Sequence, residues 1–232
     1  MSLGDDIRRI RDRAQTALVA AHDYYADTRQ MWEQLSDDIA KGRTVGYTNP
    51  VTGTATTQVE LLDRIPHYAH RLIAESTFQQ FLAIFEAFFT DLVRAWLRAY
   101  PQNLLSAEPV PVDVVIDAPD KAAITDFLVD RAVIGLMYKK PADWFAFLGK
   151  RLKIDRPDAD DVSRFAEAKA TRDVLVHNQG VANETYVAKA GPLARHPVGE
   201  FIDLPEPYHY GVHELLLKIV ADLADAVVVK FP

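Results

Sequence analysis

The stretch from residue 5 to residue 40 constrains the fold most, because its apolar side chains recur at steps of three and four. This spacing places them on one face of an α-helix, with charged side chains on the opposite face. Such a helix is about three times longer than the average of ~11–12 residues, so it needs long neighbours to bury its apolar face. Gly42 is expected to end it. The apolar positions are Ile7, Ile10, Ala14, Ala17, Leu18, Ala21, Tyr24, Thr28, Met31, Leu35 and Ile39.

A second long helical stretch is predicted from about residue 59 to residue 100, bent or restarted at Pro66. Its apolar side chains cover much of the helix circumference, which predicts a core helix that packs on more than one neighbour. The stripe is strongly aromatic and consists of Phe78, Phe81, Phe85, Phe88, Phe89, Leu92, Trp96 and Tyr100.

Residues 44–58, between these two stretches, carry a hairpin signal. Two arms rich in Thr and Val flank the turn sequence Asn-Pro-Val-Thr-Gly. An isolated hairpin is only marginally stable in water. We therefore expect it either to lie against the helices or to cross to a partner chain.

The middle of the chain is punctuated by prolines. Residues 101–118 are predicted to be a connection, with 110–116 extended and able to form one short strand. Asp117 is the expected N-cap of a helix over about 119–139. Pro141 is expected at the first position of a further helix that runs to Leu152.

The last third is predicted to hold two more helices. Acidic residues from Asp158 to Asp161 suit the first turn of a helix that ends near residue 177. An irregular stretch with one candidate strand at 200–204 follows, and a final helix covers about 208–230. The sequence thus predicts an all-α bundle with a small β-hairpin, as a single domain in which 1–58 form the N-terminal helix and hairpin and 59–232 the bundle core.

The composition excludes several classes of protein. The chain has no cysteine, so it forms no disulfide, zinc ribbon or thiol nucleophile. We expect a cytoplasmic location without membrane attachment, because the N-terminus lacks the pattern of a secretory signal and no run approaches ~18 apolar residues. The formal net charge of −7 argues against non-specific coating of nucleic acid, but it leaves room for a local basic cleft.

The segment from Thr171 to Gly180 combines chemically useful side chains with the predicted end of a helix. Asp173 and His177 are four residues apart, so a helix places them on one face within reach of each other. A carboxylate there can accept a hydrogen bond from the imidazole and fix its orientation. Asn178 and Gly180 are expected to stop the helix.

Arg172 precedes His177 by five residues, which is about 140° around an ideal helix. An arginine and a histidine suffice to cleave RNA without a metal. The histidine moves protons to or from the 2′-hydroxyl or the leaving oxygen, and the guanidinium stabilises charge on the phosphorus centre. Spacing alone is weak evidence, because Arg64 and His70 form a similar pair elsewhere in the chain.

The sequence Arg172-Asp-Val-Leu-Val-His177-Asn-Gln-Gly180 resembles the signature of the HEPN superfamily, an arginine, usually followed by a polar residue, and then a histidine four to six residues after the arginine. The aromatic stretch from Phe78 to Leu92 is similar to the long helix of bacterial HEPN proteins related to the RiboL-PSP-HEPN group. The resemblance covers roughly residues 70–230.

This resemblance implies a helical bundle that dimerises and pairs two such motifs across the interface. The implied activity is that of an endoribonuclease that needs no metal or other cofactor, often in toxin–antitoxin, abortive-infection or other defence systems. Arg172 and His177 would be catalytic, with Asp173 matching the polar residue beside the arginine. The expected partners are RNA, a second copy of the chain, and an antitoxin or other protein.

Two further side chains are candidates for contact with RNA. Asn178 follows the histidine directly, and Lys169 belongs to the segment 139–172, where nine basic residues stand against six acidic ones. A net charge of +3 there is compatible with a surface that faces RNA, and also with an ordinary solvated helix face.

Other readings of these residues stay open. Arg172 and Asp173 could be surface charges with His177 as a capping residue, or the chain could be a HEPN-type module for binding or dimerisation that does not cut RNA. His209 and His213 have a spacing that can hold a metal, although no Glu follows His209 as in the two-histidine protease motif. In the aromatic helix, Glu75 or Glu86 could reach the site or simply be surface charge.

Overall fold

The fold is built around α1 (Leu3–Ala40), the long N-terminal helix predicted from its apolar periodicity. The structure is a computed structural model that describes residues 2–104 and 109–232. A capping box starts the helix, because the Ser2 hydroxyl accepts a hydrogen bond from the Asp5 N–H and the Asp5 carboxylate accepts one from the Ser2 N–H. Gly42 follows its end with a φ of +86°, as the sequence predicted.

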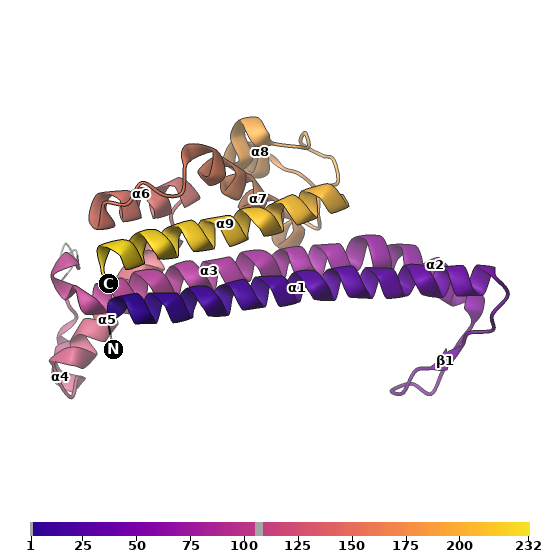
Figure 1. Cartoon of the computed structure of the whole chain (residues 1–232), viewed down its shortest axis with the longest axis horizontal. Helices are drawn as coiled ribbons and strands as arrows, with labels where there is room; N and C mark the ends of the chain where they lie inside the picture. The colour runs from indigo at the N-terminus through magenta and orange to yellow at the C-terminus, as the bar shows by residue number, and fades with distance from the viewer. Residues whose placement is uncertain (1, 105–108) are drawn as a thin grey trace.

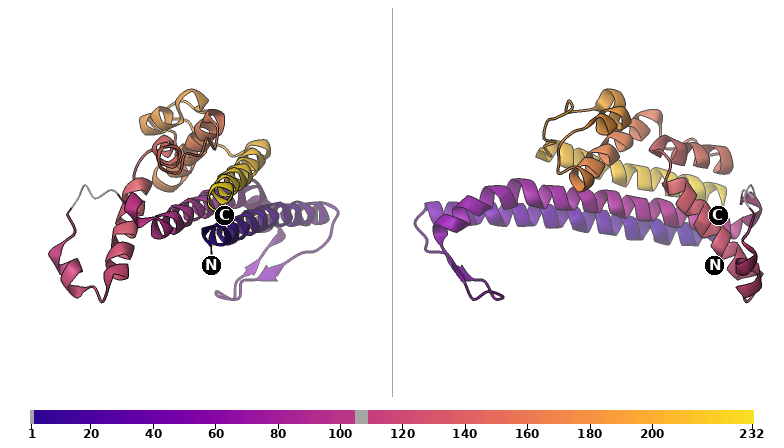
Figure 2. Two further views of the ribbon diagram at one scale, coloured as in Figure 1. Left: turned by 60° about the vertical axis from the view of Figure 1, so that its left-hand side comes forward. Right: turned by 180° about the vertical axis from the view of Figure 1, so that it is seen from behind.

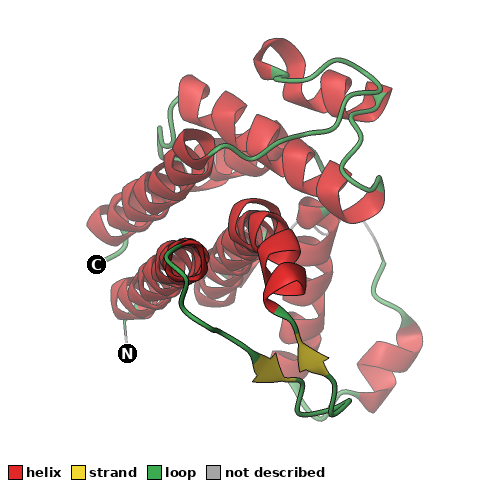
Figure 3. Ribbon diagram, turned by 90° about the vertical axis from the view of Figure 1, so that its right-hand side faces the viewer, coloured by secondary structure: helices red, strands yellow, loops and turns green. Residues whose placement is uncertain are grey.

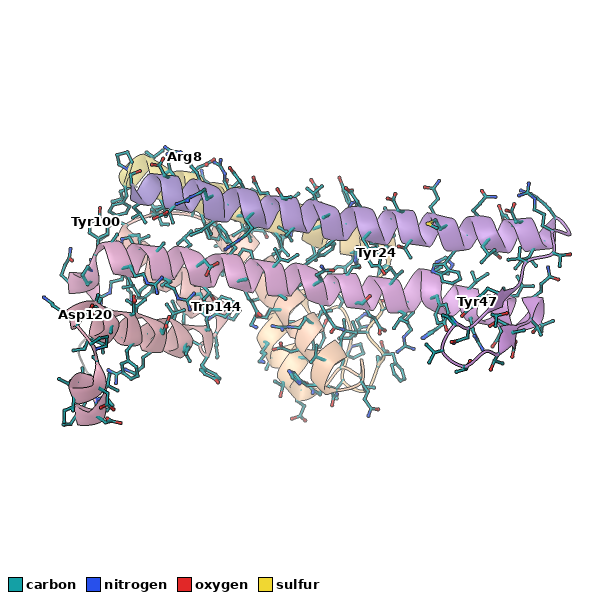
Figure 4. The ribbon with its side chains drawn as sticks, turned by 90° about the horizontal axis from the view of Figure 1, so that it is seen from below. Arg8, Tyr24, Tyr47, Tyr100, Asp120 and Trp144 are labelled. Atoms are coloured by element: carbon teal, nitrogen blue, oxygen red, sulfur yellow. The ribbon has the colours of Figure 1, made fainter. Side chains whose placement is uncertain are left out.

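The second long stretch is confirmed, and its bend is a change of helix type. The helix α2 (Gln58–His67) contains Pro66 and passes through a π-helical turn (Tyr68–Leu72) into α3 (Ile73–Ala99). Proline cannot donate the regular helix hydrogen bond, which accounts for the irregularity at this point. Figure 4 shows α3 running beside α1 along its length, with Arg8 and Tyr100 at the same end of the molecule, so the two helices are antiparallel.

A third long helix, α9 (Glu206–Lys230), lies on the α1–α3 pair and closes the core. Figure 1 shows that α9 covers the part of the pair nearer the two chain termini and leaves the opposite end uncovered. The predicted aromatic stripe of α3 lies between α1, α7 and α9, where the side chains of Phe78, Phe81, Leu82, Phe85, Phe88, Phe89, Leu92 and Trp96 are buried.

Shorter helices follow α3 in the chain, some of them packed on α3 and others further out (Figure 2). They are α4 (Val112–Asp117), α5 (Lys121–Met137), α6 (Pro141–Leu152), α7 (Ala159–His177) and α8 (Glu184–Ala190). Single 3₁₀ turns follow α3 (Pro101–Asn103) and α8 (Gly191–Leu193). The predicted bounds of α6 agree with the structure, including Pro141 at its first position.

The predicted hairpin forms, but it does not lie against the helices. Strands β1 (Tyr47–Thr48) and β2 (Ala55–Thr56) are antiparallel, with Tyr47 opposite Thr56 and Thr48 opposite Ala55. No residue between 44 and 58 is buried, so the hairpin projects into solvent beyond α1 and α2 (Figure 3). The first of the two predicted placements is therefore wrong, and crossing to a partner chain stays a prediction.

Two local predictions are also wrong. Of the segment 110–116, residues 112–116 are helical in α4 rather than extended, because the Val115 N–H bonds to the Pro111 carbonyl and no neighbouring strand pairs with it in the described chain. Asp117 ends α4, and Asp120 caps α5 by accepting from the Ala123 N–H. Residues 105–108 of the predicted connection lie outside the described residues.

The segment after Gly180 is more ordered than its prolines suggest. It contains α8, which the sequence reading missed, and Asn183 caps this helix through the Tyr186 N–H. The candidate strand at 200–204 is reduced to an isolated bridge between Val181 and Phe201. None of the described helices combines the length and apolar character needed to cross a lipid bilayer.

Candidate functional site

The segment 171–180 forms the end of α7 and the turn that follows it, as predicted. Asp158 caps the start of the helix and His177 is its last residue. The N–H groups of Asn178 and Gly180 both bond to the Val174 carbonyl, at 2.9 and 3.2 Å. Gln179 and Gly180 have φ values of +54° and +79°. This left-handed turn ends the helix and leaves the His177 side chain at its exposed tip.

Arg172 is fixed to the core helix α3 by an ion pair. Its Nη2 lies 2.6 Å from Oε1 of Glu86, and Lys169 donates to the same carboxylate oxygen. The Arg172 side chain is 18% exposed and that of Glu86 is 22% exposed, so the pair is largely shielded from water. Lys169 also lies 5.3 Å from the centroid of the Trp144 ring in α6. Glu86, which the sequence left open as surface charge, thus belongs to the site.

The predicted hydrogen bond between Asp173 and His177 is not formed. One Asp173 oxygen lies 3.2 Å from Nε of Arg172, and the other accepts a hydrogen bond from Lys189 of α8 at 2.9 Å. Asp173 therefore ties α7 to α8, a helix that the sequence reading did not include. Within the described part of the chain, His177 is exposed and has neither a hydrogen bond nor an ion pair.

Asn178 has a structural partner. Its side-chain amide donates to the Val181 carbonyl, and the Val181 N–H returns a bond of 3.0 Å to the Asn178 carbonyl. Next to it, the Ile202 N–H bonds to the Gly180 carbonyl at 2.8 Å. Hydrogen bonds therefore connect the turn to the segment around Phe201, and they fix the direction of the end of α7.

One turn before Arg172, a buried carboxylate organises a network that the sequence reading missed. Glu167 accepts hydrogen bonds from Thr171 at 2.9 Å, Tyr208 at 2.7 Å and Arg195 at 3.3 Å. Tyr186 contributes a longer bond of 3.4 Å. The partners lie up to 41 residues away in the sequence, so no local pattern identifies Glu167 among the other acidic residues of this segment.

The two tyrosines of this network remain donors. Burial raises the pKa of Tyr208 well above its usual value, and the negative charge of Glu167 raises it further. Burial also raises the pKa of Tyr186. A phenol that stays protonated can donate to the carboxylate, so the network anchors the segment 191–208 to α7.

The two histidines with metal-ligand spacing lie in a buried stack of rings instead. His209 stacks on Tyr25 at 4.0 Å, and its Nε2 is 2.9 Å from the Thr77 hydroxyl. His213 stacks on His22 at 4.5 Å. Burial lowers the pKa of His209 to about 4 and also lowers the pKa of His213. Among residues 2–104 and 109–232, no group of three His, Asp or Glu side chains could hold a metal ion.

The geometry therefore brings together part of the predicted site. A chain of ion pairs with alternating charge runs across α3, α7 and α8, and it consists of Lys169, Glu86, Arg172, Asp173 and Lys189. His177 lies outside this chain of ion pairs, at the end of α7, and its ring is exposed. No known protein family, curated protein or solved structure matches this chain.

Proposed function

We propose that this chain is a metal-independent endoribonuclease, with His177 as the proton-transfer group and Arg172 as the group that binds the reacting phosphate. The observation that supports this proposal most is the exposed, unengaged ring of His177 at the end of the helix that also holds Arg172. The resemblance of residues 172–180 to the HEPN motif supports the same assignment.

The chemistry needs only these two side chains. A ring nitrogen of His177 takes the proton of the ribose 2′-hydroxyl while the 2′-oxygen forms a bond to phosphorus. The bond from phosphorus to the 5′-oxygen breaks, and that oxygen takes up a proton from the imidazolium or from water. Arg172 donates two hydrogen bonds to the non-bridging oxygens, where negative charge builds up. The products are a 2′,3′-cyclic phosphate and a 5′-hydroxyl.

The proposal includes a homodimer, because one chain does not bring the two groups to one phosphate. Arg172 faces α3, whereas His177 lies about 140° further around α7, as for any two helix residues five apart. A second copy, placed with its motif against the first, would supply the missing partner for each half-site. Asn178 and Lys169 would then contact the RNA. We place this activity in the cytoplasm, in a toxin–antitoxin or other defence system. An antitoxin or another protein would regulate it.

A second candidate function is an interaction or dimerisation module without catalysis. The ion pairs of Arg172 with Glu86 and Asp173 favour it, because two carboxylates hold the guanidinium within the chain, although its buried Nε makes no hydrogen bond. A phosphate must compete with these carboxylates before Arg172 can act. In an endoribonuclease the carboxylates would orient Arg172 toward the phosphate. In an interaction module they would be its permanent partners.

Cleavage assays on assorted RNAs in the presence of EDTA decide between the two. The proposal predicts cleavage that leaves 2′,3′-cyclic phosphate ends and falls at least about a hundredfold in His177→Ala, the loss expected when a general base is removed. Because His177 is exposed and unbonded, the variant should unfold at the same urea concentration as the parent chain. Intact RNA with the parent protein, or equal cleavage by the variant, favours the interaction module.

A further inference from the structure

A groove lined by four arginines lies between α1 and α3, away from the 171–180 segment. Arg9 and Arg13 reach it from α1, and Arg94 and Arg98 reach it from α3. The groove has a volume of about 750 Å³, which is within the usual range of ligand sites, ~300–1,000 Å³. It lies at the end of the molecule where Arg8 and Tyr100 are labelled in Figure 4. We call it the arginine groove.

The arginines are held in place by carboxylates at the surface. Arg9 pairs with Asp6, and Arg13 pairs with Asp91. Arg94 lies 3.1 Å from Asp91 and 2.8 Å from Asp130 of α5. In the same way, Arg98 lies 2.8 Å from Asp126. The guanidinium groups are therefore oriented before any ligand arrives.

These ion pairs can be exchanged for a ligand. The side chains of Arg9, Arg13 and Arg98 are each more than half exposed, and exposed ion pairs contribute only about 0–1 kcal/mol in water. A phosphate group accepts two parallel hydrogen bonds from one guanidinium, and several phosphates on one ligand engage several arginines at once. A polyanionic ligand thus competes effectively with separate aspartates.

The floor of the groove suits an organic phosphate better than an inorganic ion. Leu3, Ile10, Ala95 and Ala99 line it between the arginines. An apolar floor excludes water from the sugar and base of a nucleotide, and a guanidinium plane can stack on the base. The lining residues include four arginines and two aspartates, and Asp126 and Asp130 pair with two of these arginines. With all four aspartates counted the groove has no net charge, so a polyanion binds by displacing the aspartates from the arginines.

We propose that the arginine groove binds the phosphates of a nucleotide unit, supplied either by an RNA strand or by a free nucleoside triphosphate. This inference does not depend on cleavage at Arg172 and His177. If the chain cleaves RNA, the groove gives the strand a second point of attachment outside the reacting site.

The test measures binding of a fluorescent single-stranded RNA and, separately, of a fluorescent nucleoside triphosphate to the full chain. The Arg9→Gln/Arg13→Gln variant should bind at least about tenfold more weakly, and its plot of log affinity against log salt should be shallower by about 2. The matched control is Arg8→Gln/Arg43→Gln. It removes the same charge from two other arginines that pair with exposed or partly exposed aspartates outside the groove, Asp5 and Asp38.

The two ligands identify the source of the phosphates. Binding of RNA alone that depends on Arg9 and Arg13 assigns the groove to RNA, and binding of the triphosphate alone assigns it to a free nucleotide. Equal weakening by the two double variants would show a general charge effect and overturn the proposal, as would the absence of binding to both ligands. His177→Ala should bind both ligands normally even if it stops cleavage, which separates this inference from the proposed nuclease function.

Discussion

Glu86 connects the core helix α3 to two cationic side chains of α7. Its carboxylate is shared by Arg172 and Lys169, and all three side chains are less than a quarter exposed. Removal of the carboxylate leaves two partly buried cations without their anion, which costs more than the loss of a surface ion pair. Glu86 therefore fixes the direction of Arg172 relative to α3.

We predict that Glu86→Ala lowers the free energy of unfolding by about 1–2 kcal/mol, measured by urea denaturation. Glu75→Ala is the matched control on the same helix. Glu75 pairs with the more exposed Arg71 one turn away, so its loss should cost about 0.5 kcal/mol or less. Equal costs for the two variants would contradict the anchoring role of Glu86.

Substitution of Tyr208 tests how much the buried network around Glu167 contributes to stability. Its hydroxyl donates to Glu167 at 2.7 Å, and a hydrogen bond to a charged group contributes about 1.5–3 kcal/mol. Tyr208→Phe should therefore lower the free energy of unfolding by about that amount in thermal or urea denaturation. Tyr210→Phe, two residues away on an exposed ring, should change it by less than about 0.5 kcal/mol.

The partners of individual side chains could not be predicted from the sequence. The spacing of Asp173 and His177 allowed a hydrogen bond, but Lys189 takes one Asp173 oxygen and Arg172 contacts the other. Lys189 lies on a helix that was not predicted, so its competition for Asp173 was invisible in the sequence. The same holds for Glu167, whose partners come from three distant segments.

Among the elements, the long helices were predictable and the short ones were not. Periodic apolar side chains located α1, α3 and α9 because these helices bury a face of several turns. Helix-start signals located α6 and α7, namely Pro141 and the acidic residues at 158–161. By contrast, α4 and α8 have six and seven residues, too few for a periodic pattern. Val and Ile make up four of the six residues of α4, so local propensity favoured an extended segment.

The packing of α9 on α1 has a pH dependence that follows from its histidines. His209 is fully buried and its pKa falls from 6.5 to about 4 on folding. The unfolded chain then binds more protons than the folded chain between these two values, so stability decreases as the pH falls through this window. His213 shifts in the same direction, partly offset by the nearby carboxylates of Glu214 and Asp23.

We predict that the free energy of unfolding drops by about 2 kcal/mol between about pH 7.5 and about pH 5 from His209 alone. Urea denaturation at the two pH values measures this change. His209→Gln keeps a polar partner for Thr77 but does not titrate, so its stability should depend less on pH by the same amount. An unchanged pH dependence in this variant would show that His209 is not the titrating group.

At the scale of the whole molecule, α1 and α3 extend beyond the helices that cover them. The ion pair between Arg29 and Glu206 marks the point where α9 begins, and α1 continues for a further eleven residues to Ala40. Beyond it, α1 packs with α2 and the π-helical turn, and the exposed hairpin follows (Figure 1). The sequence predicted every part of this extension except its exposure, which depends on where α9 starts.

We propose that Arg172 of one chain acts with His177 of another, and mixing two inactive variants tests this pairing most directly. Equal amounts of the Arg172→Ala and His177→Ala proteins are mixed with each other in denaturant and refolded together. The mixture is then assayed for RNA cleavage beside the parent homodimer. Random pairing makes half of the dimers mixed, each with one intact composite site, so about a quarter of the parent activity should return. Cleavage by the parent dimer without any recovery in the mixture would contradict a site shared between chains.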